Sequence, residues 1–334
     1  MSVPMTPPAL APAFLETAGW GGAEIRPLAG DASFRRYFRV IHPTHGRAVL
    51  MDAPPEHEDS RPFVAIAEHL DAQGLRAPRI LYRDLAAGLL LLEDFGDARV
   101  APVLAAGKGD ETAIYAAAVD TLVTLHAAPL PPGIAPYDEA VLKREVDLFV
   151  DWYLPALGVE DIDRAGFDAA WKACWPGLLA RTAAHPVLVL RDYHADNLML
   201  LEDGGLGLLD FQDALAGHAA YDLVSLLQDA RRDVDPALEA AMRERFMTRA
   251  GVTDPATFIA DYELLGAQRN VKILGIFTRL WKRDGKPHYL KFQPRMWGLV
   301  ERNLAHPALA PLARWFDTHV PARLRAAAWQ EHAA

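Results

Sequence analysis

The chain has 334 residues, of which 51% are hydrophobic and 23% charged, and its formal net charge is −10 at pH 7. This composition is typical of a globular protein with one large or two modest domains. The acidic balance argues against nucleic acid or an anionic membrane surface as the main partner, whereas a phosphate-bearing small molecule needs only local positive charge. We therefore expect a small-molecule substrate, with no nucleic-acid and no membrane partner.

The N-terminal stretch MSVPMTPPALAPAFLETAGW has no basic region ahead of its apolar residues, which is unlike a signal peptide. The chain also lacks a run of about 18 apolar residues, so no membrane span is expected. The one cysteine, Cys174, has no partner for an internal disulfide, which favours a reducing compartment. We therefore expect a cytoplasmic protein, which we take to be a monomer.

The first part of the chain predicts a small β-rich region. Residues 25–40, IRPLAGDASFRRYFRV, have the pattern of strand, turn and strand, and residues 47–56 form a third strand that ends at a double proline. Helical spacing of apolar residues follows over 61–75. Residues 77–97 contain two more short strands around Gly88.

Helical patterns dominate after residue 98. We expect helices over 111–128, 139–154, 163–183, 220–230, 236–250, 255–281, 288–304 and 307–328. Residues 187–214 interrupt them with two apolar strands, a loop and a Gly-Gly hairpin turn. The predicted fold class is α+β with two lobes. We expect residues 1–95 to form a small β-rich lobe and residues 96–334 to form a larger, mostly helical lobe with one short β insertion. A cleft between two such lobes is a common place for a small-molecule site.

The segment VLVLRDYHADNLML places Asp192 and Asn197 five positions apart, on the loop between the two apolar strands. In phosphoryl transfer, the aspartate of such a D-x4-N spacing orients the attacking hydroxyl and accepts its proton, while the asparagine reaches a magnesium ion on the nucleotide phosphates. Asp210 ends the following GLGLLDF and offers a second oxygen ligand, and magnesium needs few protein ligands. The alternative is that Asp192 and Asn197 cap a turn and Asp210 caps the next helix.

A second candidate for the metal ligand is Asp94, in the sequence EDFGD at 93–97. It precedes the D-x4-N loop, whereas a metal aspartate that acts with this loop should follow it. We therefore interpret 93–97 as the connection between the lobes, where the backbone from Glu93 to Phe95 can hydrogen-bond an adenine edge. The alternative is a plain strand-to-helix turn.

These motifs together resemble the aminoglycoside-phosphotransferase-like branch of the protein-kinase superfamily, and within it the N-acetylmuramate/N-acetylglucosamine anomeric kinases of cell-wall recycling. The resemblance covers about residues 25–300. It rests on GDASFRRYFRV (30–40), LMDAPPE (50–56), LKREVDLFVDWYL (142–154), RDYHADNLM (191–199), LLDFQDA (208–214) and YDLVSLLQDAR (221–231).

The resemblance implies a protein-kinase-like fold and an ATP- and Mg²⁺-dependent kinase with a sugar hydroxyl as acceptor. It makes Asp192 the catalytic base and Asn197 and Asp210 the magnesium ligands. The loop over the phosphates would run from Gly30 to Arg36. Its nucleotide-binding candidates are Gly30, Ser33, Phe34, Arg35 and Arg36.

One departure from the kinase pattern concerns the third strand, which reads AVLMDAPPE and has Met51 and Asp52 where kinases place a lysine that contacts the nucleotide phosphates. We expect Arg35 or Arg36 to supply the missing charge, because the arginine fork matches phosphate geometry. The departure also leaves open a nucleotide-binding regulator without catalysis.

Substrate contacts are predicted at three places. His194 follows Asp192 by two residues and Asp213 follows Asp210 by three, so both are expected near the acceptor. Glu145 shares a helix face with Phe149 and Trp152, and a carboxylate beside aromatic surface suits a sugar, although a core stripe with surface charge has the same pattern.

Two further expectations concern residues outside this set. Asp222, in AYDLVSLL, is expected to brace the catalytic loop by accepting backbone N–H bonds, and it can also cap a helix. Arg279, Lys282 and Arg283 suit the carboxylate of a muramic acid, although RLWKRDGK also has the composition of a solvated helix end.

The acceptor itself stays open at this point, since aminoglycoside, choline and homoserine kinases share the branch. A protein kinase is a weaker alternative, because no A-P-E segment or long activation loop follows Asp210.

Overall fold

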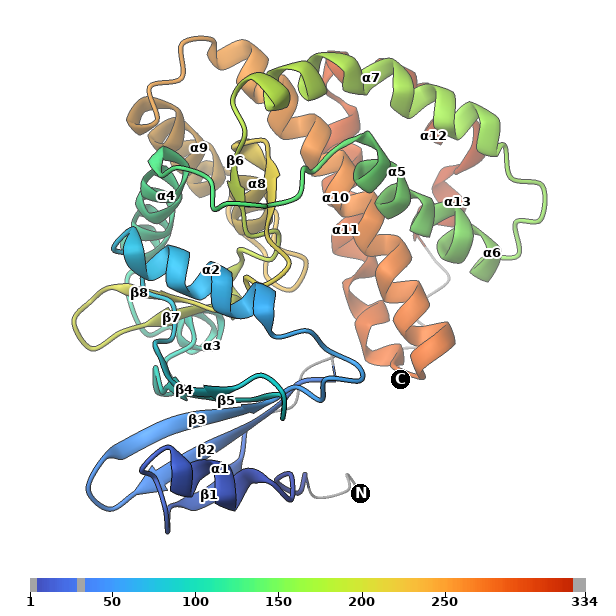
Figure 1. Ribbon diagram of the computed structural model, residues 1–334. Helices are drawn as coiled ribbons and strands as arrows, with labels where there is room; N and C mark the ends of the chain where they lie inside the picture. The colour runs from blue at the N-terminus through green and yellow to red at the C-terminus, as the bar shows by residue number, and fades with distance from the viewer. Residues whose placement is uncertain (1–4, 29–33, 327–334) are drawn as a thin grey trace. The chain divides into compact units, whose positions relative to one another are not determined.

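The computed structural model describes residues 5–28 and 34–326 of the chain (Figure 1). The chain divides into two compact units, one of Met1–Gly109 with Asp196–Ala214 and one of Asp110–Ala195 with Leu215–Ala334. A single boundary at 95/96 was expected from the sequence, whereas this division groups the hairpin after Asp196 with the N-terminal sheet.

The first unit is built on a five-stranded antiparallel sheet with the order β1-β2-β3-β5-β4. Its strands are β1 Glu24–Pro27, β2 Arg36–His42, β3 Gly46–Asp52, β4 Ile80–Asp84 and β5 Leu89–Glu93. All five were predicted. The turn between β4 and β5 needs Gly88, because its φ is +71° and a Cβ there would lie 2.1 Å from the carbonyl oxygen of Ala53.

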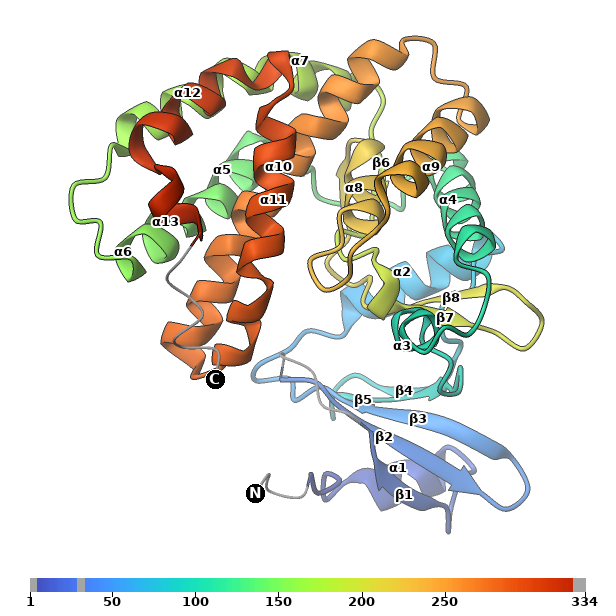
Figure 2. The same ribbon diagram turned by 180° about the vertical axis from the view of Figure 1, so that it is seen from behind.

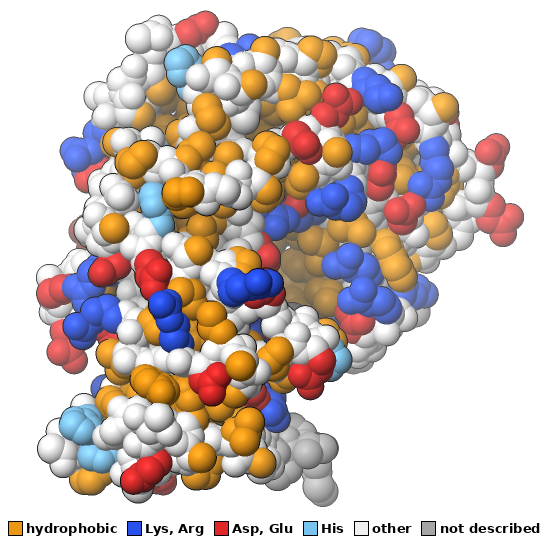
Figure 3. Space-filling model, in the orientation of Figure 1, with side chains coloured by type: hydrophobic (Ala, Val, Ile, Leu, Met, Phe, Trp, Pro, Cys, Tyr) orange, Lys and Arg blue, Asp and Glu red, His pale blue; other side chains and the backbone are white. Residues whose placement is uncertain are grey.

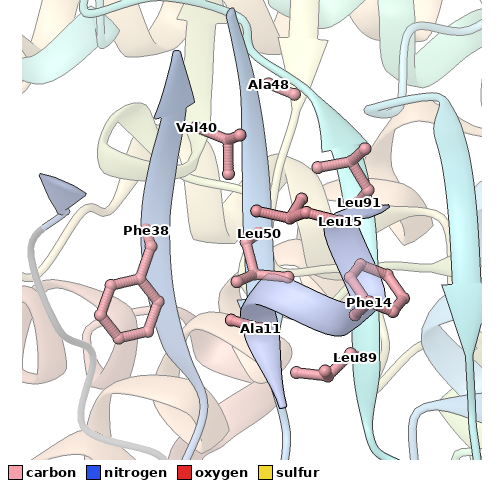
Figure 4. Packing of buried hydrophobic residues seen from close by; sticks show 9 residues of the cluster. All are labelled: Ala11, Phe14, Leu15, Phe38, Val40, Ala48, Leu50, Leu89 and Leu91. Atoms are coloured by element: carbon pink, nitrogen blue, oxygen red, sulfur yellow. The ribbon is translucent and has the colours of Figure 1, made fainter. Parts of the chain in front are cut away.

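One face of this sheet packs against helix α1, Ala11–Thr17, and forms the core shown in Figure 4. Successive side chains of a strand point to opposite faces, so alternate residues of β2, β3 and β5 reach the helix. The buried cluster consists of Ala11, Phe14, Leu15, Phe38, Val40, Ala48, Leu50, Leu89 and Leu91.

A short hairpin of β7, Leu198–Leu200, and β8, Leu206–Leu208, also belongs to the first unit, with helices α2, Arg61–Ala72, and α3, Val100–Ala105. The Leu200 N–H donates to the Ala98 carbonyl at 2.8 Å, and the Leu208 N–H donates to the Arg76 carbonyl at 2.7 Å. These bonds join the hairpin to the segment before β4 and to the segment after β5.

The second unit is mainly helical. Its helices are α4 Glu111–Ala127, α5 Glu139–Leu148, a π-helical turn Phe149–Tyr153, α6 Leu154–Ala156, α7 Arg164–Ala184, α8 Ala220–Leu227, α9 Pro236–Arg249, α10 Pro255–Asp284, a 3-10 turn Pro287–Phe292, α11 Gln293–Leu304, a 3-10 turn Pro307–Leu309, α12 Ala310–His319 and α13 Ala322–Ala326. Five of them begin after an aspartate whose carboxylate accepts a backbone N–H of the first turn. These caps are Asp110, Asp138, Asp163, Asp235 and Asp254.

Two features of this unit were not expected from the sequence. A two-stranded sheet pairs β6, Val187–Val189, with β9, Leu215–Gly217, and β9 was not predicted because its sequence, LAG, has no β-branched or aromatic residue. The helix predicted over 307–328 is broken after His319, since Pro321 disfavours helical backbone at the residue before it.

Helix α10 is the longest element, with 30 residues, and it lies side by side with α11 in both views (Figures 1 and 2). Among residues 5–28 and 34–326, no helix is long and apolar enough to cross a membrane. Lys and Arg side chains are interspersed with Asp and Glu on the face shown in Figure 3, so its described residues form no extended basic surface.

Candidate active site

The loop that leads into Asp192 is held by Asp222, as predicted. Asp222 lies on α8 with no exposed surface, and its carboxylate accepts the N–H of Leu190 at 2.6 Å and of Arg191 at 2.8 Å. Arg191 has a φ of 71°, a left-handed conformation that costs a non-glycine residue about 1 kcal/mol or more. The two bonds to Asp222 hold this strained backbone in place. Burial raises the pKa of Asp222 to about 7.

Asp192 follows directly and is partly exposed. Its carbonyl oxygen accepts the His194 N–H at 3.1 Å, and its own N–H donates to the Leu190 carbonyl at 2.9 Å, so the loop turns tightly at this residue. Burial raises the pKa of Asp192, but the positive charge of Lys272, with smaller contributions from His194 and arginines, brings this pKa below its usual value. The carboxylate is therefore ionised at neutral pH, as a group that orients a hydroxyl and accepts its proton must be.

Glu145, on α5, lies at the centre of a buried polar cluster next to this loop. It is 6% exposed, and its carboxylate accepts hydrogen bonds from Arg191 Nη2 at 2.5 Å, Lys272 Nζ at 2.9 Å, Gln268 Nε2 at 2.9 Å and the Tyr137 hydroxyl. Burial raises the pKa of Glu145, but the charges of Lys272 and Arg191 outweigh it and bring the pKa to about 2. Glu145 thus holds two cations beside the loop of Asp192, and its contact with a sugar stays a prediction.

The other two predicted substrate residues differ in their surroundings. His194 is 4% exposed, and its Nε2 lies 3.1 Å from Arg231 Nη1. Asp213 is exposed to solvent.

The structure brings Asn197 and Asp210 together at the hairpin of the first unit. Asn197 Nδ2 lies 3.4 Å from Asp210 Oδ2, and the Leu209 N–H donates to the Asn197 carbonyl at 3.0 Å. Gln212 Nε2 donates to Asp210 Oδ1 at 2.8 Å. Asp210 has a φ of 59°, the second non-glycine residue with left-handed backbone in the described chain. Both strained positions therefore lie at predicted functional residues or next to them, a common property of active sites.

The donor set at this hairpin fits magnesium. A carboxylate and an amide oxygen are hard ligands, and rotation of the Asn197 amide turns its oxygen toward the carboxylate of Asp210. In the part of the chain that the structure describes, no group of three or more His, Cys, Asp or Glu residues is arranged to hold a metal. The hairpin thus suits an ion that takes its other ligands from phosphates and water.

The competing aspartate, Asp94, is engaged in hydrogen bonds within the first unit. Its side chain is 3% exposed, and both of its oxygens accept from Arg39, Oδ2 from Nε at 2.7 Å and Oδ1 from Nη2 at 3.1 Å. Its Oδ1 also accepts the Gly96 N–H at 2.8 Å. Phe95 packs on Gly207 of β8, where an added Cβ would lie 2.6 Å from the ring. Asp94 therefore stabilises the conformation of residues 94–96 through these hydrogen bonds.

The predicted nucleotide contacts are only partly within the described chain, since Gly30 and Ser33 lie outside it. Phe34 is 61% exposed, and its ring stacks on His57 with centroids 4.5 Å apart. The Glu93 N–H donates to the carbonyl of Arg79, the residue before β4, at 2.9 Å.

The two candidate arginines lie close to carboxylates. Arg36 Nε donates to Asp52 Oδ2 at 2.8 Å, and Arg35 Nε lies 3.6 Å from Glu58. Met51, on the strand where kinases place a lysine, has no exposed surface. Nucleotide binding by either arginine stays a prediction.

A hollow of about 280 Å³ lies in the second unit, between the loop after α8 and helices α9 and α11. It is lined by polar residues that include Asp229, Arg232, Asp233, Glu239, Arg295 and Arg302. The adjacent Arg231 links this loop to His194.

Comparison with known proteins places this site in a family. Residues 24–257 match the model of the phosphotransferase enzyme family, and the chain belongs to that family. The chain is 41% identical to an N-acetylmuramate/N-acetylglucosamine kinase of Caulobacter vibrioides, over 94% of this chain and 96% of the relative. It is 42% identical to the protein of the same name from Pseudomonas aeruginosa, over 90% of this chain and 91% of the relative.

Solved structures confirm the predicted fold class. A choline kinase from Streptococcus pneumoniae aligns with a TM-score of 0.56 at 13% identity, over 91% of this chain and 99% of that one. An aminoglycoside phosphotransferase in complex with gentamicin aligns with a TM-score of 0.58 at 14% identity, over 91% and 98%. The fold is therefore the two-lobed, protein-kinase-like α+β fold of these phosphotransferases.

Proposed function

We propose that this protein is an ATP- and Mg²⁺-dependent kinase that phosphorylates the anomeric C1 hydroxyl of N-acetylmuramate and N-acetylglucosamine, as the resemblance to kinases of peptidoglycan recycling implies. The observation that carries this proposal is the identity of 41% and 42% to two kinases named for both sugars, over 90% or more of the chain. The ionised Asp192 on a braced loop supports it, because it supplies the group such a transfer requires.

Each residue of the site has one role in this proposal. Asp192 accepts a hydrogen bond from the acceptor hydroxyl, orients it and takes its proton. Asn197 and Asp210 would hold magnesium. Bound ATP would supply the phosphoryl group, and magnesium would neutralise part of the negative charge of the phosphates. Asp222 keeps Asp192 in position through the backbone of Arg191.

The remaining assignments follow the lobes. Residues 1–95 form the nucleotide-binding lobe, with the adenine at Glu93 to Phe95 and the phosphates at Gly30, Ser33, Phe34, Arg35 and Arg36. Residues 96–334 carry the acceptor site. His194, Asp213 and Glu145 are its proposed sugar contacts. We also propose that the protein is a cytoplasmic monomer.

The test is an ATP-consumption assay with Mg²⁺ on six acceptors: N-acetylmuramate, N-acetylglucosamine, glucosamine, kanamycin, choline and homoserine. Asp192→Ala serves as the blank, and Asp151→Asn, which removes a half-exposed carboxylate of the same unit, serves as the matched control. We expect turnover on the two N-acetyl sugars by the wild type and the control, with a phosphate product that is labile in mild acid. Turnover only on another acceptor would contradict the sugar assignment.

A second candidate is a nucleotide-binding regulator without catalysis, which the buried Met51 in place of a strand lysine favours. ATP binding by the wild type without turnover on any of the six acceptors would support it.

A further inference from the structure

A buried arginine of the second unit lacks a hydrogen bond in the part of the chain that the structure describes. Arg269 lies on α10 and is 4% exposed. Its Nη1 is fully buried and makes no hydrogen bond, and no hydrogen bond or ion pair joins the Arg269 side chain to any other residue within 5–28 and 34–326. A buried guanidinium without a partner is destabilising, so a protein that keeps one at this position has a use for it.

The other cations nearby show how unusual this is. Arg191 and Lys272 share the carboxylate of Glu145. Three arginines line the hollow beside α11, and each forms an ion pair. These pairs are Arg232 with Glu111, Arg295 with Asp233, and Arg302 with Glu239.

The position of Arg269 is set by its neighbours on the helix. Lys272, three residues later, lies 2.9 Å from Glu145 Oε1 and 3.3 Å from the Tyr221 hydroxyl, and Gln268 reaches the same glutamate. Residues three apart on a helix are neighbours on its surface, so Arg269 lies next to this cluster. Its charge is among those that lower the pKa of Asp192. Arg269 thus lies in the electrostatic field of the proposed base without a hydrogen bond to it.

We propose that Arg269 binds a carboxylate of the acceptor and is therefore a specificity-determining residue. This inference rests on the proposed function. N-acetylmuramate carries a lactyl ether whose carboxylate is ionised at neutral pH, whereas N-acetylglucosamine has a hydroxyl at that position. An arginine with unused N–H donors matches a carboxylate in a two-point, charge-assisted bond. It contributes to binding of the acidic sugar and not of the neutral one.

Steady-state kinetics of the full chain on both sugars test this proposal. For Arg269→Gln, we expect KM for N-acetylmuramate to rise about 10- to 100-fold, since a charged hydrogen-bonded pair is lost, and KM for N-acetylglucosamine to stay within about twofold. For Arg269→Lys, KM for N-acetylmuramate should lie between the values of the wild type and of Arg269→Gln. The matched control is Arg243→Gln, which removes a half-buried arginine of the second unit that pairs with Glu263. Its KM ratio for the two sugars should be that of the wild type.

Three results would overturn the proposal: an equal loss on both sugars, no loss on either sugar, or a changed ratio in Arg243→Gln alone. An equal loss would assign Arg269 to phosphoryl transfer or to folding. If Arg269→Gln does not fold, the wild type is compared on N-acetylmuramate and its uncharged carboxamide, for which the same 10- to 100-fold rise in KM is expected. Wild-type inactivity on both sugars would refute the proposed function itself, whereas activity with an unchanged ratio refutes only the role of Arg269.

Discussion

Two segments of the first unit, EDFGD at 93–97 and LLDFQDA at 208–214, each place an Asp-Phe pair after an apolar strand, yet their aspartates have opposite surroundings. The carboxylate of Asp94 is 3% exposed and bound by Arg39 through both oxygens. Asp210 is partly exposed, has left-handed backbone and meets the amides of Asn197 and Gln212. The sequence Asp-Phe-Gly alone therefore does not identify a metal ligand. An aspartate bonded on both oxygens by arginine orders a segment, and one that shares a site with an amide can hold an ion.

Substitution of the two aspartates should give the largest contrast. Asp210→Asn should lower kcat/KM about 1000-fold, since a metal ligand contributes several kcal/mol to the transition state, and should leave the free energy of unfolding nearly unchanged. Asp94→Asn should leave kcat/KM within about tenfold and lower the free energy of unfolding by about 3 kcal/mol, because it leaves Arg39 without its buried partner. Kinetics and urea unfolding of both variants check this, and exchanged outcomes would contradict the assignment.

Asp192→Asn should lower kcat by about 100- to 10,000-fold with little change in the acceptor KM, because the amide cannot accept the proton. Its charged neighbours lower the pKa of Asp192, so the acidic limb of the wild-type profile of kcat against pH should lie below the usual carboxyl range. If the acidic limb of this profile had its midpoint near pH 6, Asp192 would not be the group that limits activity at low pH.

Glu145→Gln should lower the free energy of unfolding by about 3 kcal/mol at pH 7, since it leaves Lys272 and Arg191 without their shared carboxylate. The folded pKa of Glu145 is about 2 and the usual value is 4.5. The contribution of the charge is therefore complete above pH 4.5 and is lost as the pH falls toward 2. Denaturant unfolding between pH 3 and 8 should show the difference from the wild type shrinking only below pH 4.5. A difference that does not depend on pH would mean that packing, and not charge, explains the loss.

Gly207→Ala should have the smallest effect, a loss of about 1 to 3 kcal/mol, because the new methyl group would lie 2.6 Å from the Phe95 ring and must displace it from β8. Gly298→Ala is the matched control, since nothing lies within 4 Å of its Cβ position and alanine favours the helix. Thermal unfolding should rank Gly207→Ala below the wild type and Gly298→Ala at or above it. Equal melting temperatures for both variants would argue against packing of Phe95 on the hairpin.

The sequence predicted local features better than contacts between distant segments. Each strand of the N-terminal sheet and the D-x4-N loop arises within about 20 residues, where spacing and turn chemistry determine the outcome. The cluster around Glu145 joins residues 127 positions apart, and no spacing relates Glu145 to Lys272. Arg269 was not singled out either, because a buried, unpartnered arginine looks like any other charged residue of a helix until the packing is known.

The proposal that residues 197–210, and not 93–97, hold the metal is tested most directly by calorimetric titration of ADP with and without Mg²⁺. Wild type and Asp94→Asn should bind ADP more tightly when Mg²⁺ is present, and Asp210→Asn should lose that gain while keeping its affinity for ADP alone. A full Mg²⁺ effect in Asp210→Asn, with its loss in folded Asp94→Asn, would contradict this account of the site.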